Sequence, residues 1–304
     1  DPRLDEDAVQ RGFEQLEASV QNRENDPQEQ YFSRVQEILA SGNPRTEALE
    51  LSDFDSIDPQ LGLQLYQERF ANAGDFSFLI VGDVDLDQIR SLAETYLAAL
   101  PDNGVREDAG DIGIERPTSQ VNETVRVGIE PVAQIATFFT GDYSYEIENN
   151  YAMSAMAEYL NIRLREELRE DAGGTYGVGV SGSPRRIPRE EYILQIFFGT
   201  DPERVDELTG RLRSVLTEER EGAPDEEYVQ RVRELQLNDF DIGSEQNGFW
   251  LRNLQAELVA GRDPGTFLSR PERIQALTAE DIAAAMDQYI NDSRRITVTR
   301  LPAE

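Results

Sequence analysis

Histidine, cysteine and lysine do not occur anywhere in this chain of 304 residues. Every cationic side chain is therefore an arginine, and the 29 arginines stand against 60 Asp and Glu residues, for a formal net charge of −31 at pH 7. These absences exclude zinc sites made from His or Cys, triads with a His base, and Lys or Cys nucleophiles. A disulfide framework is excluded as well. Any catalysis that the chain supports must come from residues beside a reaction centre held elsewhere.

The acidic excess limits the partners of the chain. It repels nucleic acid and anionic lipid, so we expect no nucleic acid partner. No segment is apolar over enough residues to span a bilayer, so we expect no membrane insertion. Molar salt shortens the screening length to about 3 Å and relieves the self-repulsion of such a surface. We interpret the composition as that of a halophilic organism; the alternative, an acidic protein from a mesophile, leaves the missing lysine unexplained.

The apolar content, 38% of residues with 13 Phe and 11 Tyr, is enough for one large or two ordinary domains. Periodicity predicts two helices within residues 5–41, others at 59–70, 86–100, 147–171, 201–219 and 279–289, and helical structure over 225–261 broken near Gly243. Strands are predicted at 76–82, 125–129, 135–140, 175–180, 192–198 and 296–300. The polar stretch 102–119 is expected to be an interdomain linker.

Two arrangements of elements occur twice in this order. A helix followed by a strand is predicted at 58–81 and again at 281–300. A strand that is followed by a glycine, an aspartate and a long helix is predicted at Gly82 and again at Gly199. Mixed order with repeated units favours an α+β fold, with helices packed on sheets, over a doubly wound parallel sheet. The first copy lacks its opening strands, so we expect the chain to begin inside a domain of a longer protein.

Two features have competing interpretations. Asp83, Asp85 and Asp87 imitate the spacing of a calcium loop, but Gln88 stands where that loop needs a glycine. Asp85 or Asp87 as the N-cap of a helix is the competing interpretation. Trp250 is either an anchor that stacks on a ligand or a packed core residue.

The glycine-rich run that begins at Gly173-Gly174 does not predict nucleotide binding. A phosphate-binding loop follows a strand and precedes a helix, whereas here a helix precedes, a strand follows, and the required lysine is missing. We expect the two glycines to end the helix and to leave a backbone edge open to close approach. Strand addition by an extended peptide needs such an edge.

Several segments together resemble one protein family. The run from Arg163 to Val178, in which an Arg near a helix end is followed seven residues later by a Tyr on the next strand, is similar to the C-terminal-half signature of the insulinase/pitrilysin zinc metallopeptidases. Further matching segments are Arg69–Ala73, Asp75–Gly82, Tyr96–Pro101, Asn247–Trp250 and Leu277–Ile282. They occur in the family's order over nearly the whole chain, so the combination is more specific than any single segment.

The resemblance implies an α+β fold of two homologous mixed-sheet-plus-helices domains of the insulinase/mitochondrial-processing-peptidase type, the first incomplete. In the family, four such domains make two bowls around a peptide chamber, and the N-terminal bowl holds zinc through His-x-x-Glu-His and a distant Glu. Residues 1–115 would then be the C-terminal part of the third domain plus the linker, and residues 116–304 the fourth domain. No metal ligand or cofactor is expected in this chain; zinc is expected in the N-terminal half.

The resemblance also implies the residues of the site. Arg169 would bind a substrate carbonyl, and Tyr176 would donate a hydrogen bond to the oxyanion of the tetrahedral intermediate. Gly173 and Gly174 would contact the substrate beside them. Without the family's pattern, Arg169 reads as one more charge on a solvated helix and Tyr176 as a core residue of a strand.

The resulting hypothesis is the non-catalytic C-terminal half of an insulinase-like zinc metalloendopeptidase, without activity of its own. Its expected partners are the N-terminal zinc-binding half of the same protein and a peptide substrate. One alternative is a catalytically inactive peptide-binding or structural homologue, acting as a scaffold or partner subunit; another is a separate acidic regulatory module. Because bacterial relatives are often exported, a periplasmic or cell-envelope location is favoured over the cytoplasm.

Overall fold

The computed structural model describes residues 3–23 and 25–303. The chain divides into two compact units. Unit 1 comprises residues 1–25, 49–110 and 240–269, and unit 2 comprises residues 26–48, 111–239 and 270–304. The predicted domain boundary between residues 115 and 116 separates two homologous domains. The compact units are defined by contacts and do not test homology, so this boundary stays a prediction.

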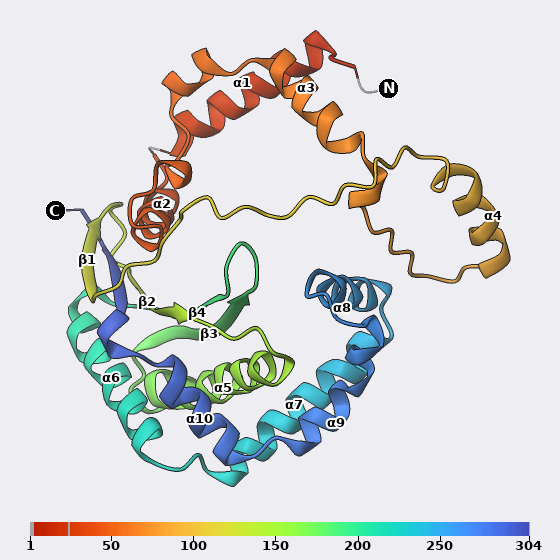
Figure 1. The fold of residues 1–304 in the computed structure, drawn as a ribbon. Coiled ribbons are helices and arrows are strands. Elements are labelled where there is room, and N and C mark those ends of the chain that lie inside the picture. Colours follow the sequence, from red (N-terminus) through yellow and green to blue (C-terminus); the bar gives the residue numbers. More distant parts are fainter. Residues whose placement is uncertain (1–2, 24, 304) are drawn as a thin grey trace. The chain divides into compact units, whose positions relative to one another are not determined.

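Unit 2 contains a mixed sheet of five strands in the order β1-β5-β2-β4-β3 (Figure 1). The strands are β1 (Val121–Arg126), β2 (Ala133–Asp142), β3 (Thr175–Arg185), β4 (Glu191–Thr200) and β5 (Ile296–Leu301). β1 and β5 are parallel, and the other neighbours are antiparallel. Among the described residues, β3 therefore has a partner strand on one side only.

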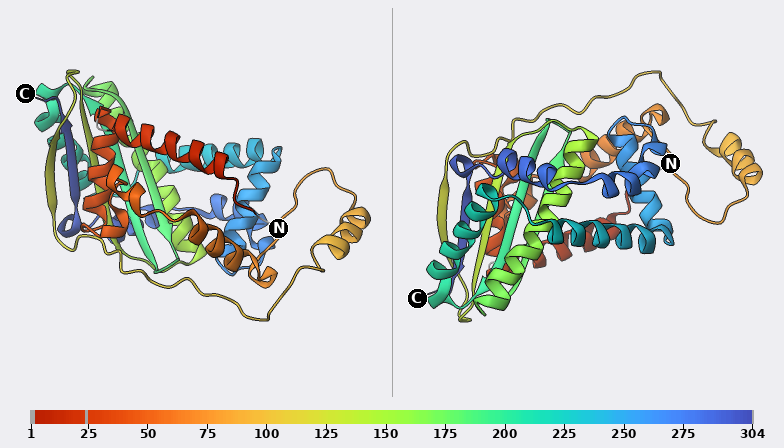
Figure 2. Two further views of the ribbon diagram at one scale, coloured as in Figure 1. Left: turned by 90° about the horizontal axis from the view of Figure 1, so that it is seen from above. Right: turned by 90° about the horizontal axis from the view of Figure 1, so that it is seen from below.

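Helices cover both faces of this sheet. They are α2 (Pro27–Leu39), α5 (Ile147–Arg165), α6 (Val205–Glu221) and α10 (Ala279–Tyr289). Two further helices are α9 (Arg270–Ala276) of unit 2 and α7 (Glu226–Ser244), which runs from unit 2 into unit 1. Seen from below in Figure 2, α5, α6 and α10 lie in front of the sheet and α2 lies behind it. The α+β class, with one mixed sheet and packed helices, is thus confirmed.

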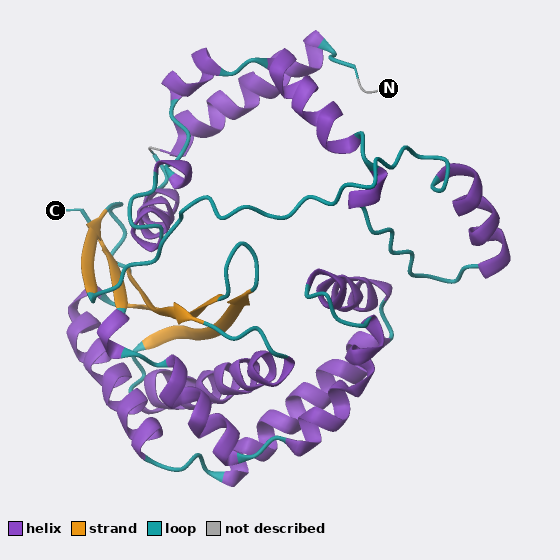
Figure 3. Ribbon diagram, in the orientation of Figure 1, coloured by secondary structure: helices purple, strands orange, loops and turns teal. Residues whose placement is uncertain are grey.

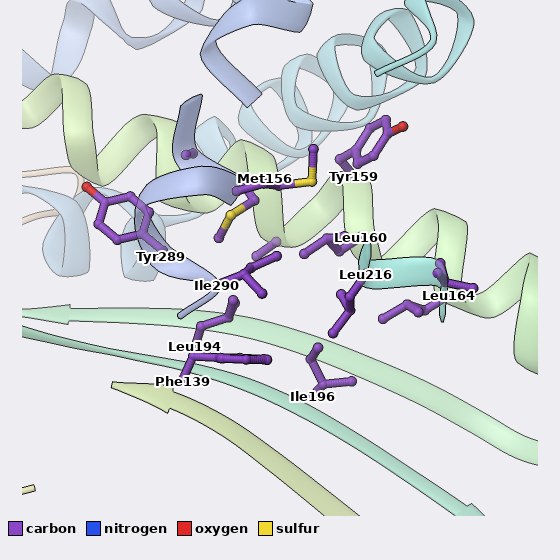
Figure 4. Close-up of a cluster of buried hydrophobic side chains, with 14 of the residues drawn as sticks. Phe139, Met156, Tyr159, Leu160, Leu164, Leu194, Ile196, Leu216, Tyr289 and Ile290 are labelled. Atoms are coloured by element: carbon purple, nitrogen blue, oxygen red, sulfur yellow. The ribbon is translucent and has the colours of Figure 1, made fainter. Parts of the chain in front are cut away.

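The side chains of β2 point alternately to the two faces of the sheet and belong to two separate apolar cores. Ile135 and Phe139 belong to the core shared with α5, α6 and α10, whereas Ala136 and Phe138 belong to the core shared with α2. Successive residues of a strand point to opposite faces, so both faces of β2 must be apolar. Figure 4 shows Phe139 on the sheet, with Leu160 of α5 above it. Each fully buried side chain of this kind stabilises the fold by about 1.5–3 kcal/mol.

Helix α2 is capped by Asp26 at its start and is attached to the opposite face of the sheet by Tyr31. Asp26 accepts hydrogen bonds from the backbone N–H groups of Gln28 and Glu29, and Pro27 starts the helix. Tyr31 is fully buried, and its hydroxyl donates to the Val298 carbonyl of β5 at 2.9 Å. Burial of the ring raises the pKa of Tyr31. The phenol therefore stays protonated and keeps donating.

Unit 1 contains helices and irregular segments but, over its described residues, no strand (Figure 3). Its helices are α1 (Glu6–Arg23), α3 (Pro59–Phe70), α4 (Leu86–Tyr96) and α8 (Asn247–Val259). Asp85 caps α4 through the N–H groups of Asp87 and Gln88, which confirms the N-cap interpretation. The predicted break near Gly243 is the gap between α7 and α8.

The predicted buried strand at residues 76–82 is wrong. These residues are irregular, and the side chains of Phe78 and Ile80 are each 53% exposed. A strand needs a neighbouring strand for its backbone N–H and C=O groups, and the described part of unit 1 offers none. A second sheet is therefore not present among the described residues, and the homology of two domains stays a prediction.

Candidate functional site

Arg169 and Tyr176 lie on successive elements of unit 2. Helix α5 continues as a π-helical segment, η4 (Glu166–Asp171), which carries Arg169, and β3 begins at Thr175. Arg169 is exposed, and its side chain makes no ion pair or hydrogen bond with the residues that the structure describes. The backbone of Tyr176 belongs to β3, but its side chain lies outside the described residues.

The turn between these residues requires both glycines. Gly173 has φ +57°, a left-handed conformation that favours glycine. At Gly174 the constraint is space, because a Cβ would lie 2.7 Å from Cδ2 of Leu208. Leu208 is fully buried on α6 and cannot swing aside freely. The predicted end of the helix at this pair is therefore explained by conformation at one glycine and packing at the other.

Hydrogen bonds from the β4–α6 connection fix the same turn. The guanidinium of Arg204 donates to the carbonyls of Ala172 at 3.1 Å and Gly173 at 3.3 Å. The Thr200 hydroxyl donates to the Gly174 carbonyl at 2.6 Å. Gly173 and Gly174 thus hold the chain in one conformation, and their contact with substrate stays a prediction.

A β-bulge follows the turn at Tyr176. Thr175 pairs with Thr200 and Val178 pairs with Phe198, so β3 advances by one more residue than β4 between these pairs. The Thr175 hydroxyl donates to the Gly199 carbonyl at 2.5 Å. Bulges bend a strand and redirect its side chains, and they are over-represented next to active sites. The irregularity therefore coincides with the position predicted to face the substrate.

A partly buried charge network anchors the π-helical segment. Arg163 Nε lies 2.7 Å from Glu219 Oε1, and its Nη1 donates to the Tyr228 hydroxyl at 3.1 Å. Glu166 accepts from Tyr228 at 2.6 Å and from Arg231 at 2.9 Å. Partial burial acts to raise the pKa of Glu166, but the bonds from Tyr228 and Arg231 hold it below its usual range. Glu166 is therefore ionised at neutral pH, which keeps η4 tied to α7.

The unpaired edge of the sheet lies next to this turn. A hollow of about 250 Å³ opens over β3 and β4, lined by Phe32, Gly179, Val180, Ser181, Gln195 and Phe197. No atoms lie within 4 Å of where a Cβ would stand at Gly177 or Gly179. An extended peptide could therefore add to the edge of β3 with its side chains over this hollow.

The structure offers no metal site of its own where it describes the chain. Over residues 3–23 and 25–303, no group of three or more His, Cys, Asp or Glu side chains is placed to hold a metal ion. Within the same residues, no helix is long and apolar enough to cross a membrane.

Trp250 has a packing role in unit 1. Its ring contacts those of Phe249 and Phe267 edge to face, with centroids 6.0 and 5.8 Å away. Its indole N–H donates to the Ser244 carbonyl at 2.8 Å. Of the two interpretations offered for this residue, these contacts favour the core residue over the ligand anchor.

Sequence reasoning missed the residues that hold the turn. Thr200 and Arg204 lie 24 or more residues beyond Thr175 and Ala172, to which strand pairing and hydrogen bonds join them. The one local signal was the Gly199-Thr200-Asp201-Pro202 sequence, which marks a strand end and a helix start. That signal gives no indication of which distant backbone the hydroxyl and guanidinium will contact.

Known proteins with related sequences include zinc proteases. The chain is 29% identical over 167 residues to a probable zinc protease PqqL of Haemophilus influenzae, a match that covers 55% of this chain and 18% of that protein. It is 23% identical over 268 residues to a probable zinc protease PqqL of Escherichia coli, covering 87% of this chain and 28% of that protein. The chain thus spans less than a third of the length of these relatives.

Solved structures share the fold. The periplasmic protease PqqL from Escherichia coli superposes with a TM-score of 0.81 at 22% identity, covering 94% of this chain and 32% of that one. A peptidase M16 inactive domain from Pseudomonas fluorescens superposes with a TM-score of 0.82 at 19% identity, covering 100% and 72%. Residues 62–236, more than half of the chain, match the family described as the Peptidase M16 inactive domain. The chain therefore belongs to the Peptidase M16 inactive domain family.

Proposed function

We propose that this chain is the non-catalytic C-terminal half of an insulinase-like zinc metalloendopeptidase and that it supplies Arg169 and Tyr176 to the active site. The observation that carries the proposal is the fixed turn between them. The backbone between η4 and β3 is held in one conformation by two glycines, each with its own steric requirement. Hydrogen bonds from Arg204 and Thr200 hold the same backbone. Preorganised donors of this kind cost no reorganisation when charge develops in a transition state.

The two side chains suit different tasks. A guanidinium offers several donors in a planar fork and stays charged at any working pH, so Arg169 would bind a substrate carbonyl in the ground state and later. A phenol donates a single hydrogen bond, so Tyr176 would stabilise the oxyanion that forms only when the peptide carbonyl is attacked. The exposure of Arg169 and its freedom from ion pairs with described residues support this role.

The metal and the rest of the chamber would come from an N-terminal half. The chain has no imidazole or thiolate, while its relatives are named as zinc proteases and are more than three times as long as the matched part. We infer that zinc is held by that half and that a peptide substrate lies between the two. By analogy with the periplasmic protease PqqL of Escherichia coli, we place the protein in the periplasm or cell envelope. The net charge of −31 supports a halophilic source.

Within this proposal, residues 1–115 are the C-terminal part of a third domain plus the linker, and residues 116–304 are the fourth domain. Support comes from the apolar side chains that residues 59–96 of unit 1 leave at least 50% exposed. They are Leu61, Leu65, Phe70, Phe78, Ile80, Leu86 and Tyr96. Phe78 and Ile80 alternate as the side chains of a strand do. Strands from the preceding part of a longer protein would pair with residues 76–82 and cover this surface.

The test of the proposal uses the full-length protein. We expect it to bind zinc and to hydrolyse a casein-type substrate, and we expect this chain alone to do neither. Arg169→Ala should lower kcat/KM in the full-length enzyme, because it removes a charged multi-donor contact to the substrate. Arg165→Ala is the matched control, since Arg165 is also exposed and carries the same charge on the neighbouring turn. Equal activity of the two variants would contradict the proposal.

A second candidate function is a peptide-binding scaffold whose partner half also lacks zinc. The open edge of β3 and the hollow beside it favour this candidate, because both would serve binding without chemistry. An N-terminal half without a His-x-x-Glu-His sequence, together with peptide binding but no hydrolysis, would support the scaffold and exclude the peptidase.

A further inference from the structure

A partly open cavity with polar and apolar walls lies at the edge of the main core layer of unit 2, where Gln120, Arg213 and Asp292 of its lining are exposed. It measures about 240 Å³ and lies between α6 and the sheet. Its floor includes Thr137 of β2 and Thr297 of β5, which are direct cross-strand partners. Their strand neighbours Phe138 and Val298 belong to the core on the α2 face, so both threonines project toward α6. Thr137 is 2% exposed and Thr297 is 6% exposed.

Helix α6 forms the roof with one polar stripe. Thr209, Arg213 and Arg220 line the cavity and recur at intervals of about one or two turns, so they lie on one side of the helix. Leu212 and Leu216 line the cavity between them and supply an apolar wall. The side of α6 that faces the sheet thus carries hydroxyl and guanidinium groups as well as apolar side chains.

Three buried polar atoms at this cavity have no hydrogen-bond partner among the described residues. They are Thr137 Oγ1, Thr209 Oγ1 and Arg295 Nε. Buried polar atoms in native proteins almost always have a partner, so each exception requires an explanation. All three belong to residues that line this one cavity, which makes it a candidate site for an occupant with polar atoms. The cavity has room for much more than one water molecule.

The charges around the cavity select an anion. Arg213, Arg220 and Arg295 contribute three guanidiniums, and Asp292 is the single carboxylate of the lining. Asp292 lies 2.5 Å from Arg295 Nη1 and 3.7 Å from Arg220 Nη1. Arg220 Nε also lies 3.7 Å from Asp287, a carboxylate outside the lining, so three guanidiniums face two carboxylates. Arg213 makes no ion pair or side-chain hydrogen bond within the described part of the chain. This positive surplus lies in a protein with a net charge of −31, where anions are repelled from most of the surface.

We propose that this cavity binds a small organic oxyanion, a carboxylate or a phosphate monoester with a short apolar tail. The guanidiniums of Arg213 and Arg220 hold the oxyanion, since a planar fork of donors fits carboxylate and phosphate oxygens. The Thr137 and Thr209 hydroxyls donate to the oxygens that reach deepest, and the tail lies against Leu212 and Leu216. None of the residues of the proposed peptidase site lines the cavity, so this inference does not depend on that function.

Calorimetric titration of the protein at constant ionic strength tests the proposal. We expect butyrate or propyl phosphate to bind saturably at one site, and we expect neutral butanol not to bind. Arg213→Gln should weaken the binding of the anion roughly tenfold to a hundredfold, the usual loss for a hydrogen bond to a charged group. Arg252→Gln is the control, because it removes the same charge from an exposed residue of unit 1 that does not line the cavity.

Thr137→Val provides a second variant that keeps the shape of the side chain. Without an anion it should unfold at the wild-type temperature or higher, because the hydroxyl that it removes has no partner. It should also lose most of the stabilisation that the anion gives to the wild type. The proposal is overturned if neither anion binds the wild type, which would leave water as the only occupant. It is also overturned if Arg213→Gln and Arg252→Gln bind the anion equally.

Discussion

Replacing Gly174 with alanine tests the packing that holds the turn between Arg169 and Tyr176. A Cβ at Gly174 would lie 2.7 and 2.8 Å from the two Cδ atoms of Leu208 and 3.0 Å from Arg204 Nη1. Real Cβ contacts are longer than this, so Leu208 or the backbone must shift.

The expected cost follows from how little Leu208 can move. Its side chain is fully buried in the main core of unit 2, so a shift forces other core side chains out of place. Extra methyl groups in packed cores typically cost about 1–3 kcal/mol. The same substitution at Gly179 is the control, because nothing lies within 4 Å of its Cβ position. Without strain, Gly→Ala stabilises by about 0.4–1 kcal/mol through the unfolded state.

Denaturant unfolding of both variants in molar NaCl measures the difference. We expect Gly174→Ala to unfold at a lower denaturant concentration than the wild type and Gly179→Ala at the same or a higher one. The double variant Gly174→Ala/Leu208→Ala should cost less than the sum of the two single changes, because the smaller side chain makes room. Equal midpoints for Gly174→Ala and Gly179→Ala would refute the packing argument.

Three further predictions concern charge. Because screening reduces the self-repulsion of a net charge of −31, the melting temperature should rise from dilute buffer to molar KCl, and a flat or falling value would contradict the halophile interpretation. Arg163→Gln removes the 2.7 Å ion pair with the partly buried Glu219, which keeps its hydrogen bond from the Tyr159 hydroxyl, and should cost about 1–3 kcal/mol in urea unfolding; an unchanged midpoint would contradict the network. The pKa of Glu166 is below its usual range. The stability that Glu166 contributes is therefore present above its unfolded pKa and is lost as pH falls through its folded pKa. Glu166→Gln should flatten the acid side of the plot of unfolding free energy against pH, and an unchanged acid slope would count against this role.

The sequence predicted those elements whose signal is local. The two helices within residues 5–41, the helix at 147–171 and the Asp85 cap of α4 each depend on residues close in the chain. Residues 76–82 failed because a strand is defined by its neighbours, and their alternation of apolar side chains cannot supply a partner. The π-helical end of α5 was missed because apolar residues at intervals of four, from Met156 to Leu168, fit an α-helix as well as a π-helical turn.

The candidate site divides in the same way. Gly173 could be predicted as a helix end, since left-handed backbone favours glycine at that position. The steric requirement at Gly174 comes from Leu208, and the bonds to the turn come from Thr200 and Arg204, all of which are distant in sequence. The cavity under α6 was not predicted, because Thr137 and Thr297 become neighbours only when β2 and β5 pair.

The turnover of Tyr176→Phe in the full-length, zinc-loaded enzyme tests most directly whether this chain completes a peptidase site. If Tyr176 donates to the oxyanion, the variant should lose kcat by roughly 10²–10³-fold, with little change in KM, because the hydrogen bond exists only in the transition state. Tyr96→Phe, which removes the hydroxyl of a unit 1 tyrosine outside the proposed site, is the control. Wild-type kcat/KM in Tyr176→Phe would contradict the account, and so would a loss of activity that only matches a loss of folded protein by circular dichroism.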